Sequence, residues 1–268
     1  MKNFLSLIAV PVLLIACNKE VNKPEEPASV GQIVISPTVT KVTETNFEQG
    51  DAIGLTIVRE SGTWAENARL SFDGGVFSGE LNWYPDKDAS TLKAYYPYSE
   101  NLPTTFSVAL DQRSGTSSSD FVAAIKNNVT PSEEAVPITF SHKLSRILIT
   151  LDNQSGKNVE GVTIGGVIPT ATVSENFEIG TANVEAANIQ ALKNSDSKYR
   201  LIIVPQTAAL TVMVTVDGNV MTQVLTSTEL MSGMEYKVSV IVYEDSINLV
   251  LSGDITNWND GGDIPFEV

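Results

Sequence analysis

The longest alternation of apolar and polar side chains runs from Ile138 to Leu151 and has the two-residue period of a half-buried β-strand. Its apolar positions are even-numbered as far as Leu144 and odd-numbered from Ile147 onward. One extra residue near positions 145–146 therefore has to be accommodated, which is what a β-bulge does. We expect a bent central strand here, where one domain passes into the next.

Shorter runs with the same alternation lie on both sides of the central run. Turn-forming residues separate them at intervals of roughly 8–12 residues, which is typical of an antiparallel sandwich. Asp217-Gly218, between two alternating runs, is the strongest hairpin signal. The expected strands are Gln32–Ser36, Ala52–Val58, Trp64–Phe72, Val76–Trp83, Thr91–Tyr98 and Thr105–Leu110 before the central run, and Val159–Val167, Glu175–Ile179, Tyr199–Val204, Leu210–Val216, Asn219–Leu225, Glu235–Tyr243 and Ile247–Leu251 after it.

Three stretches interrupt the strand pattern. Glu185–Leu192 has the spacing of one short helix, and Ser114–Ser119 is a polar loop. Pro131–Ala135, with Pro137 close behind, predicts a hinge before the central strand. No other window has a helical period over more than about two turns. The sequence therefore predicts an all-β protein.

The chain has 268 residues, of which 42% are hydrophobic, and this is enough for one large or two small cores. We favour two β-sandwich domains, because the central run divides the remaining strands into two groups of comparable length. The expected N-terminal domain covers residues 32–136 and the expected C-terminal domain covers residues 137–268.

The N-terminus is typical of an export signal over residues 1–16. Lys2 supplies positive charge, and Phe4–Ile15 is mostly apolar but too short to cross a bilayer. Leu14-Ile15-Ala16-Cys17 resembles the lipobox of bacterial lipoproteins, which predicts lipid attachment at Cys17, the chain's single cysteine. An ordinary signal peptide with an incidental cysteine is the alternative. Residues 17–31 are charged and proline-containing, and we expect them to form a disordered tether.

The charge and the scarcity of reactive side chains narrow the function classes. Lys and Arg number 17 against 32 Asp and Glu, so the surface repels nucleic acid. His142 is the single histidine, and with one cysteine this excludes Cys/His zinc sites and cysteine catalysis. It lies on an apolar strand face, where we expect it to be structural. Residues 257–263 fit a turn better than a calcium loop. We therefore expect no catalytic, cofactor-binding or metal-binding residues and no cofactor.

Aromatic residues leave a binding function open. Trp64, Trp83-Tyr84 and Tyr95–Tyr98 could stack on sugars, although their alternation within strands favours core packing. A solitary surface lipoprotein that binds glycans or host ligands is therefore one alternative. An exported hydrolase that uses a carboxylate pair is a more distant one.

Seven short stretches between about Val39 and Trp258 carry recognisable motifs. They are Phe47–Leu55 (F-x-x-G-D-x-I-G), Lys93–Tyr98 (AYYPY), Asp120–Ala123 (D-hydrophobic-x-A), Phe140–His142 (F-x-H), Pro205-Gln206 (P-Q), Gly233–Tyr236 (G-x-x-Y) and Ile255–Trp258 (I-x-x-W). In this order they resemble the motifs of the fimbrillin family, which comprises type V pilins and Mfa-like proteins of Bacteroidota.

The resemblance implies two tandem transthyretin-like β-sandwich domains, a lipoprotein precursor, and assembly by donor-strand exchange. In that mechanism a protease removes the first strand, here Gln32–Ser36, after an arginine, and a strand of another subunit fills the groove. This sequence has no arginine between Cys17 and Arg59. Lys41, at about the expected position, and Arg59 are therefore the candidate processing sites.

The end of the chain has the spacing of a donor strand, because Ile264, Phe266 and Val268 alternate. We therefore expect a structural or adhesive subunit of surface fimbriae, and not an enzyme. Its expected partners are other fimbrial subunits, the outer membrane through the N-terminal lipid, and a host or bacterial surface ligand. The missing arginine favours an accessory, anchor or unprocessed member about as much as a shaft subunit.

Overall fold

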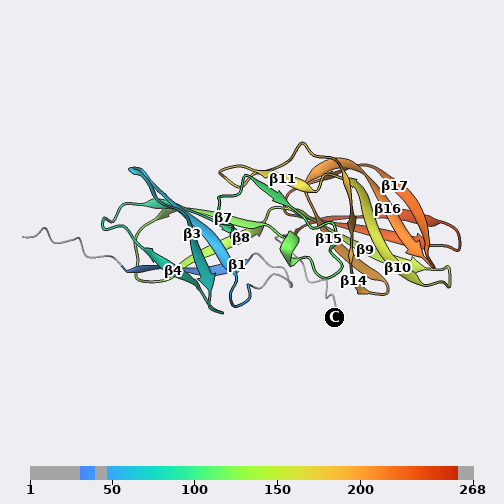
Figure 1. The fold of residues 1–268 in the computed structure, drawn as a ribbon, viewed down its shortest axis with the longest axis horizontal. Coiled ribbons are helices and arrows are strands. Elements are labelled where there is room, and N and C mark those ends of the chain that lie inside the picture. Colours follow the sequence, from blue (N-terminus) through green and yellow to red (C-terminus); the bar gives the residue numbers. More distant parts are fainter. Residues whose placement is uncertain (1–30, 40–46, 259–268) are drawn as a thin grey trace, which may run out of the picture.

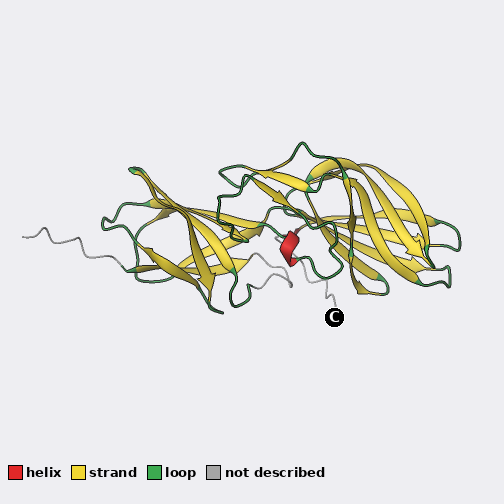
Figure 2. Cartoon of the chain, in the orientation of Figure 1, coloured by secondary structure: helices red, strands yellow, loops and turns green. Residues whose placement is uncertain are grey.

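The computed structural model describes residues 31–39 and 47–258, and these residues form an all-β structure (Figures 1 and 2). The predicted fold class is therefore confirmed at this level. The only helical element in the described part of the chain is one 3-10 turn, η1, at Ser117–Ser119. It lies at the end of the stretch that we predicted to be a polar loop.

Seven strands of the N-terminal half form a closed ring in the order β1-β4-β3-β2-β5-β7-β8. We expected a β-sandwich here, and its sheet is closed into a barrel, because β1 pairs in parallel with β8 and joins the two ends of the sheet. The strands are β1 Gln32–Val39, β2 Ala52–Arg59, β3 Gly62–Phe72, β4 Phe77–Asn82, β5 Ser90–Tyr96, β7 Val122–Val129 and β8 Val136–His142.

The other strands form three sheets with the orders β13-β10-β16-β17, β12-β11-β6 and β14-β15-β9-β18-β19. They are β6 Thr105–Ser107, β9 Ser145–Asn153, β10 Val159–Val167, β11 Thr170–Val173, β12 Ile179–Thr181, β13 Ala187–Gln190, β14 Leu192–Ser195, β15 Lys198–Ile203, β16 Gln206–Val216, β17 Asn219–Leu230, β18 Met234–Val242 and β19 Ile247–Asn257. β16 and β17 are joined at Asp217-Gly218, both with positive φ, so the predicted hairpin is confirmed.

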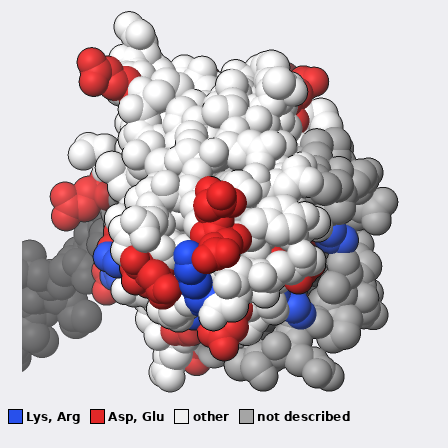
Figure 3. Space-filling view, turned by 90° about the vertical axis from the view of Figure 1, so that its right-hand side faces the viewer, with Lys and Arg blue, Asp and Glu red and all other residues white. Residues whose placement is uncertain are grey.

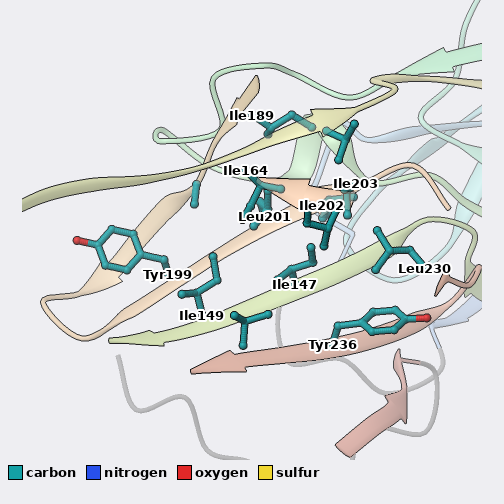
Figure 4. Packing of buried hydrophobic residues seen from close by; sticks show 14 of the residues in the cluster. Ile147, Ile149, Ile164, Ile189, Tyr199, Leu201, Ile202, Ile203, Leu230 and Tyr236 are labelled. Atoms are coloured by element: carbon teal, nitrogen blue, oxygen red, sulfur yellow. The ribbon is translucent and has the colours of Figure 1, made fainter. Parts of the chain in front are cut away.

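Two hydrophobic clusters fill the two halves of the molecule. The barrel encloses residues such as Ile53, Leu55 and Phe140, none of which is exposed. The second cluster, part of which Figure 4 shows, lies among the other sheets and includes Ile147 and Tyr199. Each cluster is built from alternate residues of its strands, as the two-residue period requires.

The segment between β5 and β7 leaves the barrel and packs in the second half of the molecule. Between β5 and β7 it forms β6, which pairs antiparallel with β11. The side-chain amide of Gln112, which is fully buried, then bonds both backbone groups of Ile202. Its Nε2 donates to the carbonyl of Ile202 over 2.7 Å, and its Oε1 accepts from the Ile202 N–H over 2.8 Å. Tyr95 of β5 and Ala123 of β7 also belong to the second cluster. The two halves therefore share parts of β5 and β7, since Ala94 and Val122 belong to the barrel cluster while their neighbours Tyr95 and Ala123 belong to the second.

The central run is two strands, and the predicted bulge is wrong. β8 ends at His142 in the barrel, and β9 begins at Ser145 in the five-stranded sheet, where it pairs with β15 and in parallel with β18. The change from even to odd apolar positions marks a change of core, because Leu144 belongs to the second cluster and Phe140 to the first.

The predicted hinge is also wrong. β7 and β8 are hydrogen-bonded neighbours in the barrel, so residues 130–135 are the connection between them, and Pro137 lies inside β8. The sheets change after His142, six residues beyond the end of the N-terminal domain that we expected at residue 136.

Two predicted elements between β11 and β14 differ from the structure. Glu185–Leu192 is not helical: β13 lies there, and its Ile189 is fully buried opposite Ile164 of β10. Pairing with a neighbouring strand overrides the local helix propensity of this stretch. Most of Glu175–Ile179 is a turn in which Phe177 has φ +59° and packs against Tyr95 and Phe121.

A buried polar cluster holds the crossover from β8 to β9. His142 Nδ1 lies 2.9 Å from Asp120 Oδ1, and both residues are about 1% exposed. Trp258, which follows β19, stacks on the His142 ring at 3.9 Å with an interplanar angle of 9°. Arg146 also lies over the Trp258 ring, with its Cζ 4.9 Å from the ring centroid, and its Nε donates to Glu235 over 2.7 Å. Three distant stretches therefore meet at one histidine, whose predicted structural role agrees with this geometry.

We predict that Asp120→Ala destabilises the fold by about 2–4 kcal/mol, because it leaves the buried His142 ring nitrogen without this partner. Chemical denaturation monitored by tryptophan fluorescence measures the change. Asp111→Ala is the matched control: Asp111 forms an exposed ion pair with Arg113, and its loss should leave the unfolding midpoint nearly unchanged. Equal effects of the two substitutions would contradict a special role for the buried cluster.

Candidate assembly site

β1 occupies the position at which the barrel closes. It pairs antiparallel with β4, where Ile35 lies opposite Phe77, and in parallel with β8, where Ile35 lies opposite Val136. Ile33 and Ile35 point inward and are fully buried. The pairing with β8 continues through Pro37 to Val39, so β1 is three residues longer than the predicted Gln32–Ser36. Both edges and one face of β1 are therefore in contact with the barrel.

A group of aromatic rings forms an apolar floor in the barrel core, in the same cluster as Ile33 and Ile35 of β1. Phe47 lies edge-on to Phe77 at 4.8 Å, to Phe140 at 5.4 Å and to Tyr96 at 5.4 Å. Phe72 adds a tilted contact with Phe77 at 5.0 Å. Removing β1 would uncover this apolar floor between β4 and β8, together with the hydrogen-bonding edges of both strands.

The motif that begins at Phe47 shapes the turn into β2. Asp51 Oδ2 accepts from the Glu48 N–H over 2.8 Å, and its Oδ1 accepts from the Tyr96 hydroxyl over 3.2 Å. Burial, followed by the nearby Asp51 charge, raises the pKa of Tyr96 to about 12. Gly54 has no room for a side chain, since a Cβ there would lie 2.3 Å from the Tyr95 ring. The motif residues are therefore required by packing rather than by chemistry.

The other stretches that resemble the fimbrillin family are also structural. Asp120, His142 and Trp258 form the cluster at the crossover. Gln206 bridges backbone groups: its Oε1 accepts from Ile168 N–H over 2.9 Å. The Tyr236 hydroxyl accepts from the N–H of Met231 over 2.7 Å. The sequence indicated these residues only as separate motifs, because spacing along the chain does not reveal which of them meet.

Of the predicted site residues, Arg59 alone lies among the described residues. Cys17, Lys41, Ile264, Phe266 and Val268 lie outside them. Arg59 is the last residue of β2, its side chain is 13% exposed, and its guanidinium pairs with Asp86 and lies 4.1 Å from the Tyr84 ring centroid. A protease would have to break these contacts before it could bind the Arg59 side chain.

The aromatic residues considered as sugar platforms are mostly in the cores. Trp83, Tyr84 and Tyr95 are at most 2% exposed. Trp64 is 42% exposed, but its Nε1 donates to the carbonyl of Asn82 over 3.0 Å and its ring packs against Tyr84. The preference for core packing therefore agrees with the structure at these three positions, and Trp64 is a single exposed ring rather than a platform.

The described residues contain no group of three or more His, Cys, Asp or Glu side chains placed to hold a metal ion. They also include no helix with the length and apolarity needed to cross a membrane.

Comparison with solved structures shows that this fold occurs in proteins of Bacteroides and Porphyromonas. A candidate cell adhesion protein from Bacteroides ovatus matches with a TM-score of 0.70 and 20% identity, covering 85% of this chain and 98% of the other. One from Bacteroides uniformis matches with a TM-score of 0.69 and 19% identity over the same shares. The C-terminally truncated tip fimbrial protein Mfa3 from Porphyromonas gingivalis matches with a TM-score of 0.53 and 7% identity, covering 85% and 99%.

A search of curated proteins returned no significant match. The family model described as fimbrillin-like matches residues 40–258, from the segment before Phe47 to Trp258. This range contains all seven motifs whose packing is described above. The family match indicates a structural, non-enzymatic protein of the cell surface. Because the match covers most of the sequence, the chain belongs to the fimbrillin-like family.

Proposed function

We propose that this fimbrial or adhesion subunit joins its neighbours by donor-strand exchange, and that β1 is the strand that is replaced. The observation that carries the proposal is the position of β1 at the closure of the barrel. Ile33 and Ile35 fill a site between β4 and β8 that a strand of another subunit could fill in the same way.

An open site would be costly, which favours exchange over simple loss of β1. Each buried isoleucine contributes about 1.5–3 kcal/mol relative to exposure. The facing edges of β4 and β8 would also lose their backbone partners, and unpaired edges seek other strands. An incoming strand restores both the apolar burial and the backbone hydrogen bonds of β4 and β8. Release of β1 and arrival of the donor strand are therefore coupled.

Lys41 is the processing site that we favour. It lies two residues after the end of β1 at Val39, so cleavage there would free the whole strand. Arg59 would be cut within the hairpin between β2 and β3, after its contacts with Asp86 and Tyr84 had been broken. A protease that accepts lysine fits the first position better.

The C-terminal residues Ile264, Phe266 and Val268 are the proposed donor. Their alternation matches that of Ile33 and Ile35, so they can enter the same pockets. We further propose that export is followed by lipid attachment at Cys17, which places the subunit at the outer membrane. In this scheme the barrel and the three sheets are two transthyretin-like domains. Other fimbrial subunits are the partners.

We predict that Cys17→Ala abolishes lipid attachment. Cells producing the chain are labelled with palmitate and fractionated. The unaltered chain should carry label and partition with the outer membrane, and the variant should lose both properties. Ser6→Ala, within the same signal segment, is the matched control and should retain them. Label in the Cys17→Ala variant would contradict the lipobox assignment.

We predict that trypsin cleavage at Lys41 starts polymer formation in the purified chain, and that the polymers persist in detergent without heating. Substituting both Ile264 and Phe266 by Ser should abolish the ladder of polymers, because the donor then lacks its apolar side chains. Glu267→Ser, on the opposite face of the same segment, should retain it. Gel electrophoresis without boiling measures the ladder.

Two controls complete this experiment. Lys41→Gln should block both the cleavage and the ladder. If trypsin releases residues up to Lys41 and no oligomer forms in any version, donor-strand exchange does not operate here. The protein would then be a self-complemented tip, anchor or solitary lipoprotein.

A further inference from the structure

β17 is a long strand at the edge of its sheet. It covers Asn219–Leu230 and, among the described residues, pairs only with β16. The strand at the opposite edge, β13, has four residues. β19, the edge strand of the five-stranded sheet, approaches β17 without pairing with it. One side of β17 therefore presents backbone groups to which another strand can bond.

The usual protection of edge strands is missing from the first part of β17. Natural edges are blunted by charges, prolines or bulges. Residues Asn219–Leu225 contain neither charge nor proline. Their register with β16 is regular from Val216 opposite Asn219 to Leu210 opposite Leu225 and shifts beyond that point. The regular, unprotected stretch is therefore seven residues long and is centred on Thr222.

This stretch carries two of the most exposed apolar side chains among the described residues. Val220 is 60% exposed and Val224 is 52% exposed. They lie on the same outer face as Thr222, beside Thr215 and Thr211 of β16. The end of the molecule that carries β16 and β17 shows few charged atoms over its upper surface (Figure 3). For a chain of net charge −15, such a surface is where a second copy can approach with least repulsion.

We propose that two copies of this chain pair through β17, antiparallel and about a two-fold axis at Thr222. The spacing is self-complementary: Val220 of each copy lies opposite Val224 of the other, and Thr222 lies opposite Thr222. Each exposed valine then covers the other, and cross-strand pairs of β-branched residues stabilise a sheet. The two four-stranded sheets become one continuous sheet. A strand of the same chain is the natural occupant, because the same seven residues supply both sides of the contact.

No charged side chain lies within the paired stretch, because Asp217 precedes it in the hairpin turn and Glu229 follows it. Glu229 lies beyond the regular stretch, after the shift in register, so the two copies do not bring their Glu229 side chains together. The contact does not involve β1 or the residues after Trp258. It can therefore form whether or not donor-strand exchange takes place, and it adds a lateral contact to the linear one that exchange would produce.

Disulfide trapping tests the geometry. In the full-length chain carrying Cys17→Ser, Thr222→Cys supplies the only thiol. Opposed Cα atoms of an antiparallel pair lie about 4.5–5.5 Å apart, within the range that a disulfide spans. Thr163→Cys is the matched control. Thr163 of β10 lies opposite Met213 of β16, which in turn lies opposite Thr222 of β17. In the proposed dimer, five strand spacings would separate Thr163 of one copy from Thr163 of the other, a distance of about 24 Å. With a mild thiol oxidant, Thr222→Cys should form a linked dimer and Thr163→Cys should remain monomeric.

Sedimentation of the Cys17→Ser chain gives an independent measure. It should show a concentration-dependent dimer, and Val224→Lys should weaken dimerisation by at least about tenfold, because a charged side chain then lies opposite Val220 and the apolar contact between the two valines is lost. Glu229→Lys, outside the paired stretch, should leave the dimer intact, and thermal melting should show that both variants fold. The proposal is overturned if the chain stays monomeric at all concentrations, or if Thr222→Cys and Thr163→Cys cross-link equally. Long ladders instead of a dimer would also overturn it.

Discussion

The parallel pairing of β1 with β8 is the interaction on which the N-terminal barrel depends. All other neighbours in that ring are antiparallel, and these antiparallel pairs alone would leave β1 and β8 as open edges. β1 comes first in the chain and β8 last, so the ring closes between segments about 100 residues apart. Closing a loop of this length costs more conformational entropy than closing the short hairpins of neighbouring strands. In the donor-strand exchange proposed above, β1 is the strand that leaves, and the antiparallel pairs among the other six strands stay in place.

The crossover after β8 sets the relation between the two halves. β8 is the last strand of the barrel and β9, two residues later, is the middle strand of the five-stranded sheet. The end of the described chain returns to this point, where Trp258 stacks on His142 and lies against Arg146. β5 and β7 reinforce the connection, since Tyr95 of β5 and Ala123 of β7 pack in the second cluster while Ala94 and Val122 pack in the barrel. The halves are thus joined by packing as well as by the chain.

The strands that could be predicted from the sequence were those with one buried face and a clear turn at each end. β10 matches the predicted range, and the hairpin of β16 and β17 was located from Asp217-Gly218. The failures have a common physical cause. β7 is rich in Ala, Asn and Lys, which favour strands weakly, and it is held by β5 and by the second core. Residues 185–192 have a helical pattern, but pairing with β10 decides their structure.

The site was less accessible to sequence reasoning than the strands. The family motifs pointed to Asp120, His142 and Trp258 separately, and only the fold brings them together. The first strand was identified from its alternation, but its parallel partner β8 was not, because a parallel contact between distant segments leaves no local signal. Arg59 follows the strand expected at Ala52–Val58 and ends β2 in the structure, but its ion pair with Asp86, 27 positions away, could not be predicted from the neighbouring residues.

The N-terminal barrel has no free strand edge, whereas the sheets of the second half do, and this difference bears on how subunits could assemble. The barrel has no free edge while β1 is in place, so a partner strand can bind there only by displacing it. The second half has sheets with open ends, and β17 is the longest strand at such an end. An edge that must first be opened suits a contact that is made once, under the control of a protease. An edge that is always available suits a reversible contact between finished subunits, and its strength is limited by the seven residues that stay in register with β16.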